Sequence, residues 1–92
     1  MDLEVNYDKL NSKDEAYSQV KEAITPELLA KFQVKAELSY KEDQIIAKGK
    51  GFELVLNFTD HSCQVNLTLS LLLKAFRSKI TSALEKQIKR IV

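Results

Sequence analysis

Two neighbouring segments with strict alternation of apolar and polar residues constrain the fold of this chain most strongly. Residues 52–58 place Phe or Leu at every second position, and residues 63–69 repeat the alternation with Cys, Val and Leu. Side chains two residues apart on a strand lie on the same face, so each segment predicts a strand with one apolar face. Asp60-His61-Ser62 between them suits a tight turn. We therefore expect an antiparallel hairpin with one polar face and one buried face.

Three further segments predict strands. Residues 3–7 alternate from Leu3, and residues 36–40 alternate from Ala36. A polar turn at residues 41–44 leads to a strand at residues 45–48, and Gly49-Lys50-Gly51 turns the chain again. Such short connections favour an antiparallel meander for the four later strands.

The segment after the first strand predicts a helix. Ser12 and Glu15 form a capping box, in which the Ser hydroxyl accepts from a free backbone N–H. One face of this helix carries Ala16, Val20, Ala23 and Ile24.

Pro26 interrupts that helix, because proline suits the first turn of a helix and disrupts its interior. Two alternatives follow. Either Thr25 caps a second short helix that carries Leu28, Leu29 and Phe32, or a single helix is kinked at Pro26.

From about Ser70 to the end, the apolar spacing becomes helical and predicts a helix of about 20 residues. Its apolar stripe consists of Leu73, Phe76, Ile80, Ala83, Leu84, Ile88 and Ile91. The predicted order is β-α-β-β-β-β-α. We expect one α+β domain over residues 1–92, an antiparallel four- to five-stranded sheet packed by helices.

Charge and composition do not favour several classes of protein: polyanion binders, disulfide-bonded proteins, secreted proteins and membrane-spanning proteins. The formal net charge is +1, which does not favour a dedicated polyanion binder, and the single cysteine, Cys63, permits no internal disulfide. The chain starts without the basic and apolar segments of a signal peptide, and no stretch approaches about 20 apolar residues. We expect a cytoplasmic protein without a transmembrane segment.

No motif predicts catalysis. Asp60, His61 and Ser62 have the residue types of a hydrolytic triad, but adjacent residues in a turn do not line up as nucleophile, base and orienting acid. His61 and Cys63 are too few ligands for a structural zinc site. Gly49-Lys50-Gly51 is shorter than a phosphate-binding loop. We expect no enzyme, no cofactor and no metal.

The start of the last helix is the candidate surface. It has more apolar residues than one helix face needs, beside a cluster of basic residues. The residues predicted to contact a surface or partner are Leu71, Leu72 and Phe76, with Lys74, Arg77 and Lys86 as a polar rim. The alternatives are a core helix with a basic outer side, a helix that pairs with its copy in a homodimer, or a helix that lies on a membrane surface.

Binding of RNA or DNA is a weaker alternative. The helix-β-β-β-helix order occurs in double-stranded-RNA-binding domains, which use basic side chains to reach phosphates. Here the expected helix start carries Leu71, Leu72 and Leu73, with Lys74 as its only base.

The chain resembles the small bacterial polyhydroxyalkanoic acid system proteins, also called polyhydroxyalkanoate granule-region proteins. The resemblance spans nearly the whole chain, and its most recognisable part is residues 65–74, which run into a long helix. The family usually has Leu-Gly where this chain has Leu69-Ser70, and Pro26 is not expected there. Further matching positions are Ala16, Val20, Ile24, Phe32, the segment 51–54, Ile80, Leu84 and Ile88.

The resemblance implies an association with storage-polyester metabolism, and it transfers no catalytic residue. We expect a non-enzymatic accessory protein that binds a hydrophobic granule surface or a protein partner. A small homodimeric structural module is the alternative.

Overall fold

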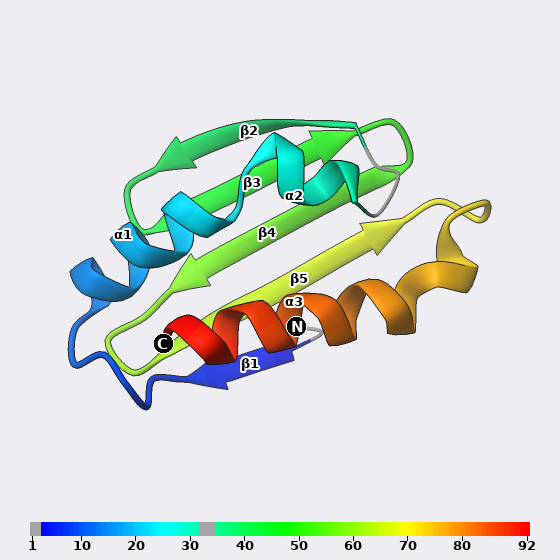
Figure 1. Ribbon diagram of the computed structural model, residues 1–92. Coiled ribbons are helices and arrows are strands. Elements are labelled where there is room, and N and C mark those ends of the chain that lie inside the picture. The colour runs from blue at the N-terminus through cyan, green and yellow to red at the C-terminus, as the bar shows by residue number, and fades with distance from the viewer. Residues whose placement is uncertain (1–2, 32–34) are drawn as a thin grey trace.

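A computed structural model of the protein describes residues 3–31 and 35–92. Its centre is one five-stranded sheet in the order β1-β5-β4-β3-β2, with all neighbouring strands antiparallel (Figure 1). The strands are β1 (Leu3–Asn6), β2 (Ala36–Lys41), β3 (Gln44–Gly49), β4 (Phe52–Phe58) and β5 (Ser62–Leu69). The predicted meander of the four later strands is confirmed, and so is the predicted fold class.

The β4–β5 hairpin has the register that the alternation predicts. Leu56 lies opposite Val65 and Leu54 lies opposite Leu67, and all four side chains are buried. Because paired residues point to the same side of the sheet, the two apolar faces merge into one surface.

The meander has a two-residue turn between β2 and β3 and another between β3 and β4. The second residue of each turn has a left-handed backbone. Asp43 has a φ of 58° and Gly51 has a φ of 74°. Aspartate tolerates this conformation better than most residues do, and glycine adopts it freely. The short connections therefore follow from residue types that permit them.

The first helical region is two helices, α1 (Lys13–Ala23) and α2 (Pro26–Ala30). The Ser12 hydroxyl accepts from the backbone N–H of Glu15 at 3.2 Å, as the capping box predicts, and the Glu15 carboxylate reaches back to accept from the Ser12 hydroxyl at 3.3 Å. Thr25 adopts an extended backbone, and its hydroxyl accepts from the N–H of Leu28 at 3.2 Å. Of the two alternatives at Pro26, the separately capped second helix is therefore the observed one. Phe32, which was expected to follow on this helix, lies outside the described residues.

The helices cover one face of the sheet (Figure 1). β1 and β2 form opposite edges, so the chain from β1 to β2 must cross the sheet, and α1 and α2 lie along this crossing. The last helix, α3 (Arg77–Ile91), packs against β1 and α1. It turns Ile80, Leu84 and Ile88 into the core, at the spacing of one helical face.

The prediction that the last helix starts near Ser70 is wrong. Residues 71–73 form a turn, and Lys74–Phe76 form a 3₁₀ turn (η1) before α3 begins at Arg77. Leu73 N–H donates to the Ser70 carbonyl at 3.1 Å, and Phe76 N–H donates to the Leu73 carbonyl at 2.9 Å. The chain leaving β5 must reverse direction to lay α3 back over the sheet, and these tight turns make the reversal. Phe76 consequently leaves the predicted buried stripe and is exposed.

We expect Thr25→Ala to lower the free energy of unfolding by about 1 kcal/mol, because the start of α2 loses its side-chain cap. Urea denaturation monitored by circular dichroism measures this change. The matched control is Ser18→Ala at an exposed position within α1, which should change stability by less than about 0.5 kcal/mol. Equal effects of the two substitutions would contradict a stabilising cap at Thr25.

Candidate functional site

The turn between β5 and α3, residues 70–76, is where apolar side chains protrude. Leu71 is 87% exposed, Leu72 is 89% exposed and Phe76 is 51% exposed. Among the described residues, these are three of the four large apolar side chains that are exposed. We call residues 70–76 the β5–α3 turn. It forms one corner of the molecule, beyond the end of β5 (Figure 1).

The neighbouring β3–β4 turn holds the β5–α3 turn in place. The Ser70 N–H donates to the Gly51 carbonyl at 2.8 Å. A Cβ atom on Gly51 would lie 2.7 Å from the Ser70 hydroxyl, so the absence of a side chain permits the close approach. Leu73 packs partly buried against the core. Leu71 and Leu72 therefore project from a backbone that is held before them by the Ser70–Gly51 hydrogen bond and after them by the packing of Leu73.

Of the predicted basic rim, Lys74 and Arg77 lie at the β5–α3 turn, whereas Lys86 lies farther along α3. Lys74 is exposed within the turn itself. Arg77 donates from Nη2 to the Leu67 carbonyl at 3.1 Å, so its guanidinium also ties the start of α3 to β5. Lys86 is exposed but follows Phe76 by ten residues, which at 1.5 Å per residue is about 15 Å along the helix.

One basic residue near the turn was not chosen from the sequence. Lys79 is exposed and follows Phe76 by three residues, which is just under one helical turn. It lies closer along the chain to the exposed leucines than Lys86 does. The signal that could have found it is the helical spacing of Lys79 and Lys86, which are seven residues apart and so share a face.

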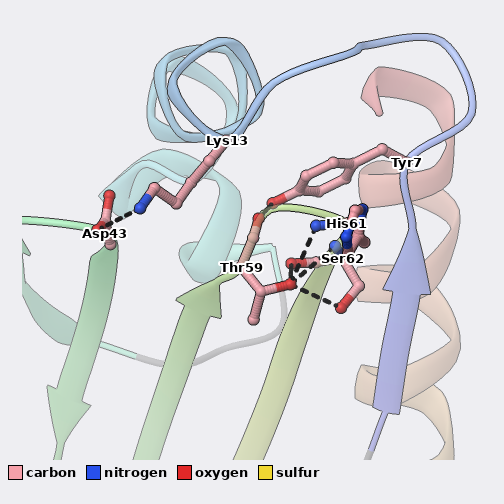
Figure 2. A network of polar contacts seen from close by, with 6 residues as sticks. All are labelled: Tyr7, Lys13, Asp43, Thr59, His61 and Ser62. Carbon is pink, nitrogen blue, oxygen red and sulfur yellow. Dashed lines mark hydrogen bonds and ion pairs between the residues drawn. The ribbon is translucent and has the colours of Figure 1, made fainter.

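Figure 2 shows the hydrogen bonds that hold His61 and Ser62 in the β4–β5 turn. The Thr59 hydroxyl accepts from the backbone N–H of His61 at 3.2 Å and of Ser62 at 3.0 Å. Tyr7 donates from its phenol to the Thr59 carbonyl at 2.7 Å, and Ser62 donates from its hydroxyl to the Glu4 carboxylate at 2.7 Å. These bonds close the turn, tie Tyr7 to the turn itself and tie β1 to the first residue of β5.

These hydrogen bonds in the turn do not pair the Ser62 hydroxyl with the His61 imidazole as nucleophile and base. The Ser62 hydroxyl is directed to Glu4, a carboxylate on β1, and His61 lies exposed at the tip of the turn. Cys63 is buried, and burial raises the pKa of its thiol to about 12, so the thiol stays protonated at neutral pH. Within residues 3–31 and 35–92, no group of three or more His, Cys, Asp or Glu side chains could hold a metal ion.

The face of the sheet away from the helices is mainly polar and nearly balanced in charge, with Ile46 and Val55 as one apolar pair on it. Its strands carry amides such as Asn57, whose Oδ1 accepts from the Gln44 side chain at 2.8 Å. The aromatic residues of the strands, Tyr40, Phe52 and Phe58, alternate onto the helix-covered side with their buried neighbours. Stacking of bases on this open face therefore has no aromatic platform among the described strand residues.

A family model matches residues 8–92 of the chain, which include every element from α1 to α3. Its description is "Putative polyhydroxyalkanoic acid system protein". The chain belongs to this family.

The polyhydroxyalkanoic acid system family is thus the one that the sequence resemblance named, and the match includes the β5–α3 turn and the crossing helices. No curated protein and no solved structure gave a significant match to the chain. In the described part of this family member, no helix is both long and apolar enough to cross a membrane.

We expect Thr59→Val to lower the free energy of unfolding by roughly 1–3 kcal/mol, because it leaves the N–H groups of His61 and Ser62 without their acceptor. His61→Ala should change stability by less than about 0.5 kcal/mol, since this side chain is exposed. Urea denaturation of both variants tests the pair. A larger loss for His61→Ala than for Thr59→Val would show that the histidine side chain has a structural role.

Proposed function

We propose that this protein is a non-enzymatic accessory protein of the polyhydroxyalkanoate system, which binds the hydrophobic surface of cytoplasmic polyester granules through its β5–α3 turn. The observation that carries the proposal is the pair Leu71 and Leu72, which are almost fully exposed on a fastened turn. Membership of the polyhydroxyalkanoic acid system family supports a polyester as the hydrophobic phase.

The physical argument rests on the cost of exposing these side chains to water. Transfer of a Leu or Phe side chain from water to an apolar phase gains roughly 1.5–3 kcal/mol. Leu71, Leu72 and the exposed half of Phe76 can enter such a phase without unfolding, because the core does not use them. Three side chains of this size support weak, reversible attachment.

The basic residues suit the rim of such a contact. Lys74 and Lys79 have long apolar stems that can lie along a hydrophobic surface while their ammonium groups stay in water. Lys86 would extend the rim along α3, and Arg77 would hold the turn in position through the Leu67 carbonyl. An apolar centre with charged surroundings predicts binding that salt weakens only slightly.

A protein partner at the granule is the second candidate for the same surface. The same exposed leucines would fit an apolar pocket on such a partner, because central apolar anchors dominate protein interfaces. The two candidates differ in one respect that can be measured: direct attachment needs only polyester, whereas a partner must be present for indirect attachment.

The test is co-sedimentation of the purified protein with protein-free polyester particles, at low salt and at high salt. We expect the wild-type protein to sediment with the particles at both salt concentrations and Leu72→Asp to stay in the supernatant, because a carboxylate at this position would have to leave water. Ser18→Asp, which adds the same charge at an exposed position of α1, is the matched control and should sediment like the wild type.

Circular dichroism shows whether Leu72→Asp is folded, which its exposure predicts. Failure of the wild type to bind bare particles, with binding to native granules that retain their proteins, would replace the polyester with a protein partner. Failure on both would overturn the proposal.

A further inference from the structure

β2 ends the sheet at one side, and its outer edge is not paired with another strand of the described chain. All six of its residues pair one to one with β3, without a bulge. It contains no proline. A regular edge strand of this kind presents unpaired backbone N–H and C=O groups, which another strand can pair with.

The edge also carries the fourth exposed large apolar side chain, Tyr40, at 39% exposure. Its phenol donates to the Ile24 carbonyl at 3.1 Å, and the Lys21 ammonium lies 5.1 Å from the ring centroid. The ring is therefore held in place rather than free to turn away. Leu38, two residues earlier on the same face, is only partly buried.

The sequence of β2 is complementary to itself when it runs antiparallel. With Ser39 opposite Ser39 of a second copy, Glu37 lies opposite Lys41 at both ends of the pairing. In the same register, Leu38 lies opposite Tyr40 twice, on the helix-covered side. Opposite charges and aromatic–aliphatic pairs across strands both stabilise a sheet.

The neighbouring registers lack this match. Paired residues must point to the same face, so the nearest symmetric alternatives are centred on Leu38 or on Tyr40. Centring on Leu38 places Glu37 opposite Ser39, and centring on Tyr40 places Lys41 opposite Ser39. Both lose the two Glu37–Lys41 pairs, so opposite charge favours the register centred on Ser39.

A row of alternating charge on the open face of the sheet also favours the register centred on Ser39. Glu53 on β4 lies opposite Lys48 on β3, and Lys48 lies opposite Glu37 on β2. The row ends at the edge of the sheet with the negative charge of Glu37. In the register centred on Ser39, the next position is Lys41 of the second copy, which continues the alternation.

We propose that β2 pairs with β2 of a second copy of this chain, in the antiparallel register centred on Ser39, and so joins two sheets into one of ten strands. The partner surface is the identical strand, and its two Glu37–Lys41 pairs set the register. This interface uses neither the β5–α3 turn nor α3, and it does not depend on the proposed function.

The first experiment measures mass by sedimentation equilibrium over a concentration series. The wild type should approach twice the chain mass of 10.5 kDa. Glu37→Lys places lysines opposite each other at both ends, and we expect it to weaken dimerisation at least tenfold. The charge exchange Glu37→Lys with Lys41→Glu restores both opposite-charge pairs and should recover the dimer. Glu27→Lys, at an exposed position of α2, is the charge-matched control and should behave like the wild type.

The second experiment fixes the register. Ser39→Cys places two thiols opposite each other on the two-fold axis, where Cα atoms of paired residues are about 4.5–5.5 Å apart, within the range that a disulfide spans. We expect rapid cross-linking to a covalent dimer under mild oxidation. Thr68→Cys, exposed on β5 in the other half of the sheet, should cross-link slowly, and buried Cys63 should not compete.

A wild type that is monomeric at every concentration would overturn the proposal. So would a dimer that is unaffected by Glu37→Lys and does not cross-link through residue 39, because such a dimer would form elsewhere, for example through α3. Glu37→Lys is judged only if its circular dichroism and urea midpoint match those of the control, and the Ser39→Cys result decides the proposal if they do not.

Discussion

Burial of the apolar face of the β4–β5 hairpin is the constraint on which the rest of the structure depends. Leu54, Leu56, Val65 and Leu67 form a continuous surface that a single hairpin leaves in water. Three helices pack across this surface. α1 and α3 each bury side chains at helical spacing, and α2 buries Leu29. The crossing of α1 and α2 follows from this need, because β1 and β2 lie at opposite edges and the connection between them must pass over the face. The other face is mainly polar, with Ile46 and Val55 as its apolar pair, and no helix covers it, so the chain forms two layers and not three.

The same constraint explains why apolar side chains protrude at the β5–α3 turn. The chain has to reverse between β5 and α3, and the bond from Ser70 to the Gly51 carbonyl fixes where the reversal begins. Leu73 reaches the core from there, while Leu71 and Leu72 fall on the outside of the turn. A chain selected only for stability gains nothing from leucines at these positions. That is why we propose the turn as a contact surface. Membership of the polyhydroxyalkanoic acid system family is the reason that our proposal names a storage polyester as the hydrophobic phase.

The two proposed contact surfaces are separate in the fold. The β5–α3 turn lies at the end of β5, whereas β2 is the far edge of the sheet, with β4 and β3 between them. They also differ in chemistry: the turn offers apolar side chains with a basic rim, and the β2 edge offers backbone groups and paired opposite charges. One surface can therefore be altered without the other, which allows attachment to a granule and pairing of copies to be studied independently.

The sequence by itself determined the local elements. The period-two alternation predicted the β4–β5 hairpin, Ser12 and Glu15 predicted the start of α1, and the absence of a workable constellation around His61 indicated a plain turn. Only the tertiary structure decided that β1 lies beside β5, since a strand of four residues does not encode its partner. It also decided that α3 begins at Arg77 and not near Ser70, because the apolar spacing at residues 71–76 suits a helix equally well and the reversal of the chain overrides it. The charge row that ends at Glu37 likewise joins residues from three strands, and such a row exists only after pairing has set the register.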